Sequence, residues 1–197
     1  MKPRTIATAI ACLLLFVGAC DKTEEPPERQ WERGFFKPYL GREFELAGGL
    51  DVTRIIGAED FIPASELPLD MTIRNFNSGR VNTKFPAGLV FEPMNLEYQY
   101  MILLQDFYFS VPAEAETIIS LPTYCCNEDL DEPDDESVYR KFEIQVWERE
   151  LNELFDLVKE KLLEGDDAVI LAQDALFEIT DGDSLTDATR TALRNLP

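Results

Sequence analysis

The feature that most constrains the fold is a change in the spacing of apolar residues along the chain. From about residue 35 to residue 126, apolar residues recur at every second position in short runs, which is the spacing of half-buried β-strands. Several short strands separated by proline and glycine predict an antiparallel, Ig-like β-sandwich. Pro86 and Pro122 place their strands at edges or bulges, because proline has no N–H for the ladder. The expected strands lie near 44–46, 71–73, 85–91, 101–111 and 119–125.

After an acidic loop at 127–137, the apolar residues take helical spacing. The first helical run ends near Gly165, and Ser184 with Asp187 has the pattern of a helix N-cap. These segments are too apolar to stand alone, so we expect them to pack on one another and on the sandwich. The expected fold is therefore α+β, with a C-terminal helical module of about three helices. They are expected over about 147–162, 166–180 and 184–196.

The first twenty residues have the layout of a bacterial export signal. A basic start with Lys2 and Arg4 precedes an uncharged run at 6–16, which is too short for a spanning helix of about 20 residues. The ending Val17-Gly18-Ala19-Cys20 resembles the lipobox of bacterial lipoproteins, in which the cysteine is acylated and becomes the new N-terminus. An ordinary signal peptide with a cysteine near the cleavage point is the alternative.

The lipobox resemblance implies a diacylglycerol and an N-acyl chain on Cys20. Several acyl chains together hold a protein stably at a membrane where one chain does not. We therefore expect a protein of the bacterial cell envelope, anchored to a membrane and facing the periplasm or the exterior. The expected parts are a signal peptide (1–19), a lipidated flexible tether (20–34), a β-sandwich domain (35–137) and the helical module (138–197).

Charge and composition exclude several classes of function. The formal charge of −20 becomes −22 when the leader and its two basic residues are removed, and such a field repels nucleic acid and anionic headgroups. The chain has no histidine, which excludes Ser-His-Asp and Cys-His catalysis and most catalytic zinc sites. We assign no catalytic residue and no cofactor other than the covalent lipid. An enzyme that uses carboxylates alone is an alternative.

Two stretches resemble a recurring sandwich domain of secreted bacterial proteins. The first is FPAGLVFEPMNLEYQYMILLQDFYFSVPAEAETIISLPTYCCNE, and the second, AQDALFEITDGDSLTD, is similar to the helix that often follows that domain. Together they span roughly residues 84 to 187. The resemblance implies architecture and export, and it implies no established activity.

Cys125 and Cys126 are the candidate redox residues of the mature chain. Neighbouring Cα atoms lie about 3.8 Å apart, below the usual disulfide range of about 4.4–6.8 Å, so a vicinal disulfide is strained. Because side chains alternate along a strand, we expect one thiol to be buried and one exposed. A vicinal disulfide, an intermolecular bridge and thiolate metal binding are the alternatives.

Two acidic segments are candidate cation sites. The loop N127-E-D-L-D-E-P-D-D-E136 has seven carboxylates in its last nine positions but no glycine to turn ligands inward, which favours a solvated charge run. The segment at 181–187, DGDSLTD, offers Asp181, Asp183 and Asp187 as metal candidates. Leu185 stands at a ligand position there, which favours helix capping over calcium binding.

These observations predict a lipid-anchored envelope protein that is not an enzyme. It is expected to act as an interaction or structural module, with the membrane and another envelope protein as partners and no nucleic acid. The alternative is a thiol-redox or metal-responsive envelope protein that uses Cys125, Cys126 and the adjacent acidic loop.

Overall fold

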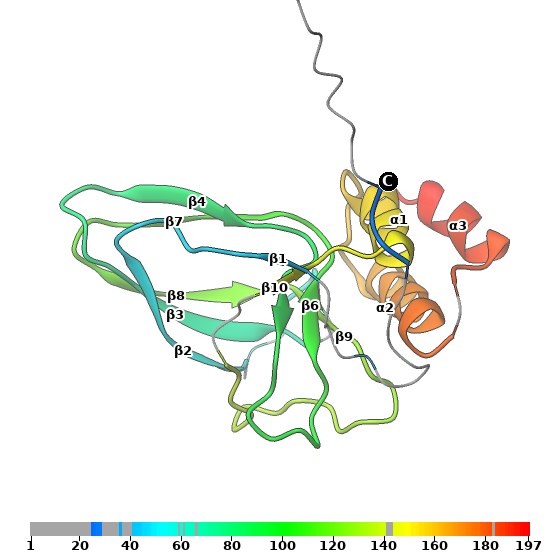
Figure 1. Ribbon diagram of the computed structural model, residues 1–197, viewed down its shortest axis with the longest axis horizontal. Coiled ribbons are helices and arrows are strands. Elements are labelled where there is room, and N and C mark those ends of the chain that lie inside the picture. The colour runs from blue at the N-terminus through cyan, green and yellow to red at the C-terminus, as the bar shows by residue number, and fades with distance from the viewer. Residues whose placement is uncertain are drawn as a thin grey trace, which may run out of the picture.

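The chain forms antiparallel strands in several small sheets and three helices within the residues that the structure describes, and the arrangement is α+β. The helices gather at one end of the β-rich part (Figure 1). Among the described helices, none has the length and apolar character needed to cross a bilayer. The computed structural model describes residues 25–28, 36, 41–58, 60, 62–65, 67–140, 144–182 and 184–197.

The strands pair as four small sheets, β1-β10, β2-β3-β8, β4-β7 and β5-β6-β9. The strands are β1 (Gly41–Glu43), β2 (Leu50–Gly57), β3 (Leu69–Asn75), β4 (Val81–Phe85), β5 (Val90–Phe91), β6 (Met101–Leu103), β7 (Phe107–Val111), β8 (Glu116–Leu121), β9 (Thr123–Cys125) and β10 (Ile144–Val146). The helices are α1 (Arg149–Val158), α2 (Asp166–Thr180) and α3 (Asp187–Arg194).

Two of the expected strands are the arms of one long, bent hairpin. Phe85 lies opposite Phe107 and Val90 opposite Ile102, so both arms advance by the same number of residues between the ladders β4-β7 and β5-β6. The bend falls at Gly88, whose φ is +82° and whose N–H donates to Leu103 O at 2.7 Å. The expected run at 101–111 is therefore two strands, because the chain turns between them.

The expected strand at 119–125 changes sheets at Pro122. Before the proline, β8 pairs with β3, and after it β9 pairs with β6 of a different sheet. Proline has no N–H to donate, so the ladder ends there and the chain is free to change direction. One segment thereby joins the two sheets that face each other across a shared core.

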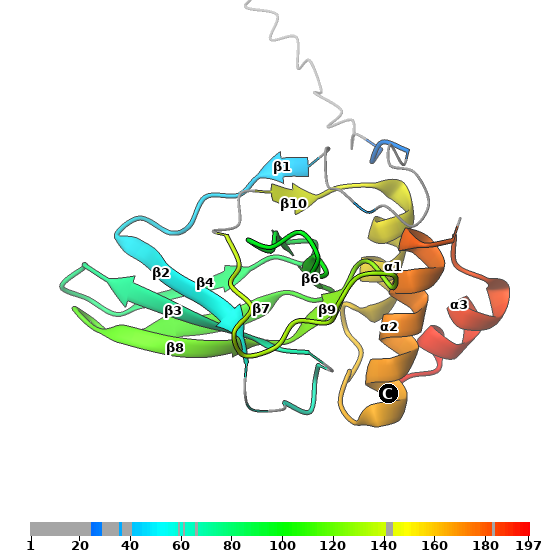
Figure 2. The ribbon, with the colours of Figure 1, turned by 90° about the horizontal axis from the view of Figure 1, so that it is seen from below.

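The sheet β5-β6-β9 is buried on both faces. One face packs with the sheet β2-β3-β8, and the other packs with the helices, which lie beside β6 and β9 (Figures 1 and 2). Strands covered on both faces have nearly continuous apolar sequences, as these do. The first core includes Ile73, Phe85, Phe91, Met101, Leu103 and Cys125, and the second includes Ile102, Tyr124, Cys126, Leu154, Leu176 and Leu193.

Strands β2 and β10 were not expected from the sequence, and the strand expected near 44–46 lies instead at Gly41–Glu43, as β1. In β2 the register shifts between Val52 and Arg54, and this bulge makes Val52 and Ile55 the buried positions, three residues apart instead of two. Strand β10 is three residues long and pairs with β1, so it is too short to show a period. Neither β2 nor β10 has a sustained run of apolar residues at every second position, which was the pattern from which strands were predicted.

Gly57 allows the acidic loop to lie against β2. Its N–H donates to Ser137 O at 2.9 Å, and a Cβ at this position would lie 1.9 Å from Asp134 O. Since the obstacle is backbone, the loop must move if any side chain is added at this position. Glycine is therefore required here by close approach of two backbones.

We predict that Gly57→Ala lowers the free energy of unfolding by about 2–3 kcal/mol, because the added methyl group forces the loop away from β2. Thermal unfolding of the full chain measures the effect. Gly79→Ala is the matched control, because a Cβ at Gly79 meets nothing within 4 Å. Equal unfolding temperatures for the two variants would contradict the close approach.

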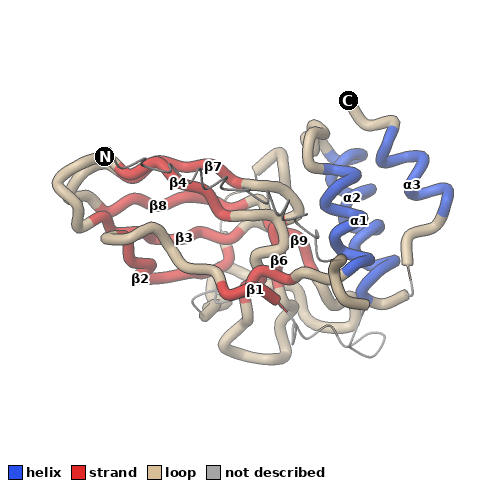
Figure 3. The backbone as a smooth tube through the Cα atoms, turned by 45° about the horizontal axis from the view of Figure 1, so that its top comes forward, coloured by secondary structure: helices blue, strands red, loops and turns tan. Residues whose placement is uncertain are grey.

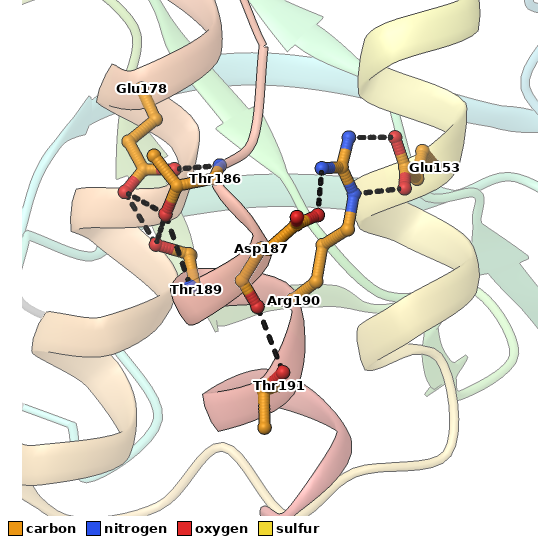
Figure 4. A network of polar contacts seen from close by, with 7 residues as sticks. All are labelled: Glu153, Glu178, Thr186, Asp187, Thr189, Arg190 and Thr191. Atoms are coloured by element: carbon orange, nitrogen blue, oxygen red, sulfur yellow. Dashed lines mark hydrogen bonds and ion pairs between the residues drawn. The ribbon is translucent and has the colours of Figure 1, made fainter.

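A polar network ties α3 to the other two helices (Figure 4). Arg190 makes a two-point contact with Glu153 of α1, at 2.6 Å from Nε and 3.1 Å from Nη2. Glu178 of α2 accepts a hydrogen bond from the Thr186 N–H at 2.7 Å. Figure 3 shows the three helices side by side at this end of the molecule.

The boundaries of two helices differ from the expectation. The N-cap of α3 is Thr186, whose Oγ1 accepts from the Thr189 N–H at 3.2 Å, and the expected cap, Ser184, lies two residues earlier. Gly165, with φ +83°, is the N-cap of α2, while α1 already ends at Val158. The second helix begins and ends where the sequence indicates.

The contact between Glu153 and Arg190 predicts a pH-dependent contribution to stability. The hydrogen bond from Arg190 lowers the pKa of Glu153 below its ordinary value of 4.5. A carboxyl with a lowered pKa in the folded chain stabilises the fold above its unfolded pKa, and this contribution is lost as the pH falls through the folded pKa.

We therefore expect Glu153→Gln to cost about 0.5–1 kcal/mol at pH 7, since the pair is partly exposed, and to cost progressively less as the pH falls through the lowered pKa of Glu153. Unfolding curves of the wild-type chain and the variant across pH 3–7 measure this difference. Glu160→Gln, an exposed substitution of the same chemistry, serves as the control. A difference that does not change with pH would contradict an ionic origin.

Candidate functional site

The two adjacent cysteines are both buried, at 4% exposure for Cys125 and 0% for Cys126. Their side chains point to opposite faces of β9, as expected, but each face of this strand meets a core. The expectation of one exposed thiol is therefore wrong, because it assumed that one face of the sheet meets water. No disulfide joins the two residues in the structure.

Gln173 of α2 completes the outer edge of β9. Its Oε1 accepts from the Cys125 N–H at 2.8 Å, and its Nε2 donates to Cys125 O at 2.8 Å. The side-chain amide thus makes the pair of hydrogen bonds that a neighbouring strand would make. The helix and the sheet are joined at this point by polar contacts as well as by the apolar core.

Residues 62–65 and 67–68 cover the rest of the same edge. Ser65 Oγ donates to Thr123 O at 2.5 Å, and Thr123 Oγ1 donates to Leu67 O at 2.7 Å. The hydroxyl of Tyr124 donates to Ala64 O at 3.0 Å. A strand edge satisfied in this way is closed to pairing with another chain.

The thiols have the environment of structural cysteines. Burial raises the pKa of the Cys126 thiol well above its ordinary value, and the nearby Cys125 and Asp181 raise it further. Cys125 Sγ lies 3.8 Å from the Met101 sulfur, inside the core. Reactive thiols need a lowered pKa and access to solvent, so these properties are opposite to those of a redox centre.

The acidic loop is solvated at its carboxylates but fixed along its backbone. The N–H of Asp131 donates to Glu97 O at 3.0 Å, and the N–H of Gln99 donates to Asp131 O at 3.0 Å. Further along, Asp134 accepts from Ser137 Oγ at 2.7 Å, and this bond lowers the pKa of Asp134. The loop therefore presents its charges from a defined position.

The three metal candidates at 181–187 do not form a described cluster. Asp183 lies outside the described residues, and Asp187 pairs with Arg190 at 3.3 Å. Asp181 accepts from Thr180 Oγ1 at 2.8 Å, and burial raises its pKa. In the part of the chain that the structure describes, no three Cys, Asp or Glu residues are grouped as a metal site. Leu185 is buried among the helices, so this segment closes the helical core.

Cys125, Gln173 and the acidic loop meet at one cavity, which we name the Cys125 cavity. Its volume is about 310 Å³, and Cys125, Gln99 and Gln173 line its inner part. Glu132 of the acidic loop and Asp174 of α2 also line it, and both are exposed. The cavity thus brings together the thiol and the acidic loop that the sequence singled out separately.

The remaining wall of the cavity is apolar. Leu67, Ile170 and Phe177 line it, and Ile170 is 49% exposed. An apolar wall with a few convergent polar groups is typical of binding sites. The arrangement can bind a group through burial and charge.

Gln99 and Gln173 are the site residues that sequence reasoning missed. Each is polar, buried and placed within an apolar segment, at 3% and 5% exposure. In α2 the signal was a glutamine between Ala172 and Ala175, on the buried face of the helix. For Gln99 the sequence held no comparable signal, because its partner Leu130 lies in the acidic loop.

The lipidation candidate Cys20 and the ending Val17-Gly18-Ala19 lie outside the described residues. Of the expected tether, residues 25–28 are described, and Pro27 O accepts from the Arg149 N–H at the start of α1 at 3.0 Å. The chain matches no protein-family model, no curated protein and no solved structure.

We predict that Gln173→Met, which keeps the volume of the side chain, lowers the free energy of unfolding by about 2–4 kcal/mol. The reason is that it leaves the buried N–H and C=O of Cys125 without their partners. Hydrogen exchange of the Cys125 amide gives a local measure. Its protection should fall by more than that of Ile73 in β3, which reports global unfolding. Equal losses at both amides would show that the amide contact is not specific to this edge.

Proposed function

We propose that the protein is a lipid-anchored module of a bacterial cell envelope that binds another envelope protein and catalyses no reaction. The observation that carries the binding role is the Cys125 cavity, in which an apolar wall meets two carboxylates, Glu132 and Asp174. These groups suit recognition of a partly apolar cation. The leader that ends in Cys20 is the observation that supports a location in the cell envelope.

The proposal includes a lipid on Cys20 and an Ig-like sandwich as the core of the domain. Support for the sandwich comes from two sheets that face each other across a shared core and are joined by one strand that changes sheets. Support for the lipid comes from the four residues VGAC after an uncharged run. The anchor would concentrate an acidic domain beside the membrane, where a basic partner is attracted to it.

Intact mass spectrometry of protein extracted from bacterial membranes tests the anchor. We expect a chain that begins at Cys20 and carries a diacylglycerol and an N-acyl chain, and we expect Cys20→Ala to abolish the modification. Cys12→Ala is the matched control, since it changes another cysteine of the leader and should leave the modification unchanged. An unmodified Cys20 in the wild-type chain would refute the lipid anchor.

A further inference from the structure

The charged residues described at the Cys125 cavity, Glu132 and Asp174, are both acidic. Glu132 and Asp174 come from different elements, the acidic loop and α2, and no basic residue among those that the structure describes lines the cavity with them. The formal charge of −20 on the whole chain adds to the same field. A cation is therefore attracted to this position, and an anion is repelled.

One polar atom at the cavity, the side-chain Oε1 of Gln99, receives no hydrogen bond from the described residues. Gln99 lines the cavity and is 3% exposed, and its Nε2 donates to Leu130 O at 3.1 Å. Its Oε1 is buried and accepts no hydrogen bond from any described residue. A buried acceptor without a donor is destabilising, so a donor supplied from outside would be stabilised here.

The size and the apolar wall of the cavity fit one long side chain. A volume of about 310 Å³ lies at the lower end of the range for ligand sites, which runs from about 300 to 1,000 Å³. Leu67 and Phe177 offer apolar contact inside, and the half-exposed Ile170 offers it to a partner surface. A lysine side chain combines an apolar stem with a compact head that has three donors.

We propose that the Cys125 cavity receives a lysine side chain of a partner polypeptide. The stem packs against Leu67 and Phe177, and the ammonium group lies among the carboxylates of Glu132 and Asp174 and the Oε1 of Gln99. Three acceptors match the three ammonium hydrogens in number. Because Oε1 is covered in the unbound chain, a small rotation of the Gln99 side chain accompanies binding. This inference rests on the proposed binding function and names the chemistry of the partner.

Ligand-observed NMR on the purified full chain tests the proposal with Nα-acetyl-lysine amide as the probe. Saturation transfer to the probe should be saturable, and Nα-acetyl-norleucine amide, which lacks the ammonium group, should bind at least fivefold more weakly. The double variant Glu132→Gln/Asp174→Asn should weaken lysine binding at least fivefold. The matched control, Glu114→Gln/Glu116→Gln, changes two exposed carboxylates that do not line the cavity and should alter binding less than twofold.

A substitution at Gln99 distinguishes binding in the cavity from attraction by the overall negative charge. Gln99→Met keeps the length of the side chain but removes Oε1 and also the Nε2 donor to Leu130 O. It should weaken lysine binding without weakening norleucine binding, in protein whose folding is verified by circular dichroism. Equal binding of lysine and norleucine derivatives to the wild-type chain would overturn the proposal. So would equal lysine binding by the wild-type chain and the Glu132/Asp174 variant.

The failure of this inference is distinguishable from failure of the proposed function. If the chain is acylated at Cys20 and cross-links to an envelope protein but does not bind the lysine probe, the cavity proposal is wrong while the envelope function stands. If the probe binds but Cys20 carries no lipid, the cavity proposal stands without the envelope location.

Discussion

The rest of the structure depends on one small sheet, β5-β6-β9, that has no face exposed to water. Both cores are built on it, one shared with β2-β3-β8 and one shared with the helices. Its open edge at Cys125 is completed by the Gln173 amide of α2. Removing the helix would expose the second core to water and would remove both hydrogen bonds between Gln173 and Cys125. The helical end and the β-rich part are for this reason held together by two kinds of interaction at the same position.

The sequence predicted the strands best where one face is buried and the other is solvated. The strand at 69–75 alternates and was found, whereas β2 was missed because a bulge between Val52 and Arg54 breaks its period. The runs at 101–111 and 119–125 were found as apolar segments, but the alternation continues across each break. The first run is divided by a turn, and the second by the change of sheets at Pro122. The proline indicated an irregularity at that point, but the sheets that the chain joins are set by distant partners, which no local pattern reveals.

The same limit explains which parts of the candidate site were predicted. Adjacent cysteines were easy to single out, and their opposite orientation followed from strand geometry. Their burial did not follow, because one face of the strand is covered by helices from a later part of the chain. Gln99 and Gln173 carry the polar contacts of the site, yet a single glutamine in an apolar segment has no pattern to distinguish it. The acidic loop was read correctly as solvated, but its fixed backbone arises from pairing with 97–99.

Three of the polar groups at the Cys125 cavity, the carboxylates of Glu132 and Asp174 and the Oε1 of Gln99, do little for the stability of the fold. Glu132 and Asp174 have the same sign on a chain of net charge −20, and the buried Oε1 of Gln99 receives no hydrogen bond from the described residues. Elsewhere along this edge the described polar groups are satisfied, from Ser65 through Thr123 to Cys125. Groups that lack a favourable partner within the fold occur most often at functional positions, where a bound ligand supplies the missing partner. Here the group left out is a hydrogen-bond donor with positive charge, and the fixed backbone of the acidic loop holds Glu132 in place to meet it.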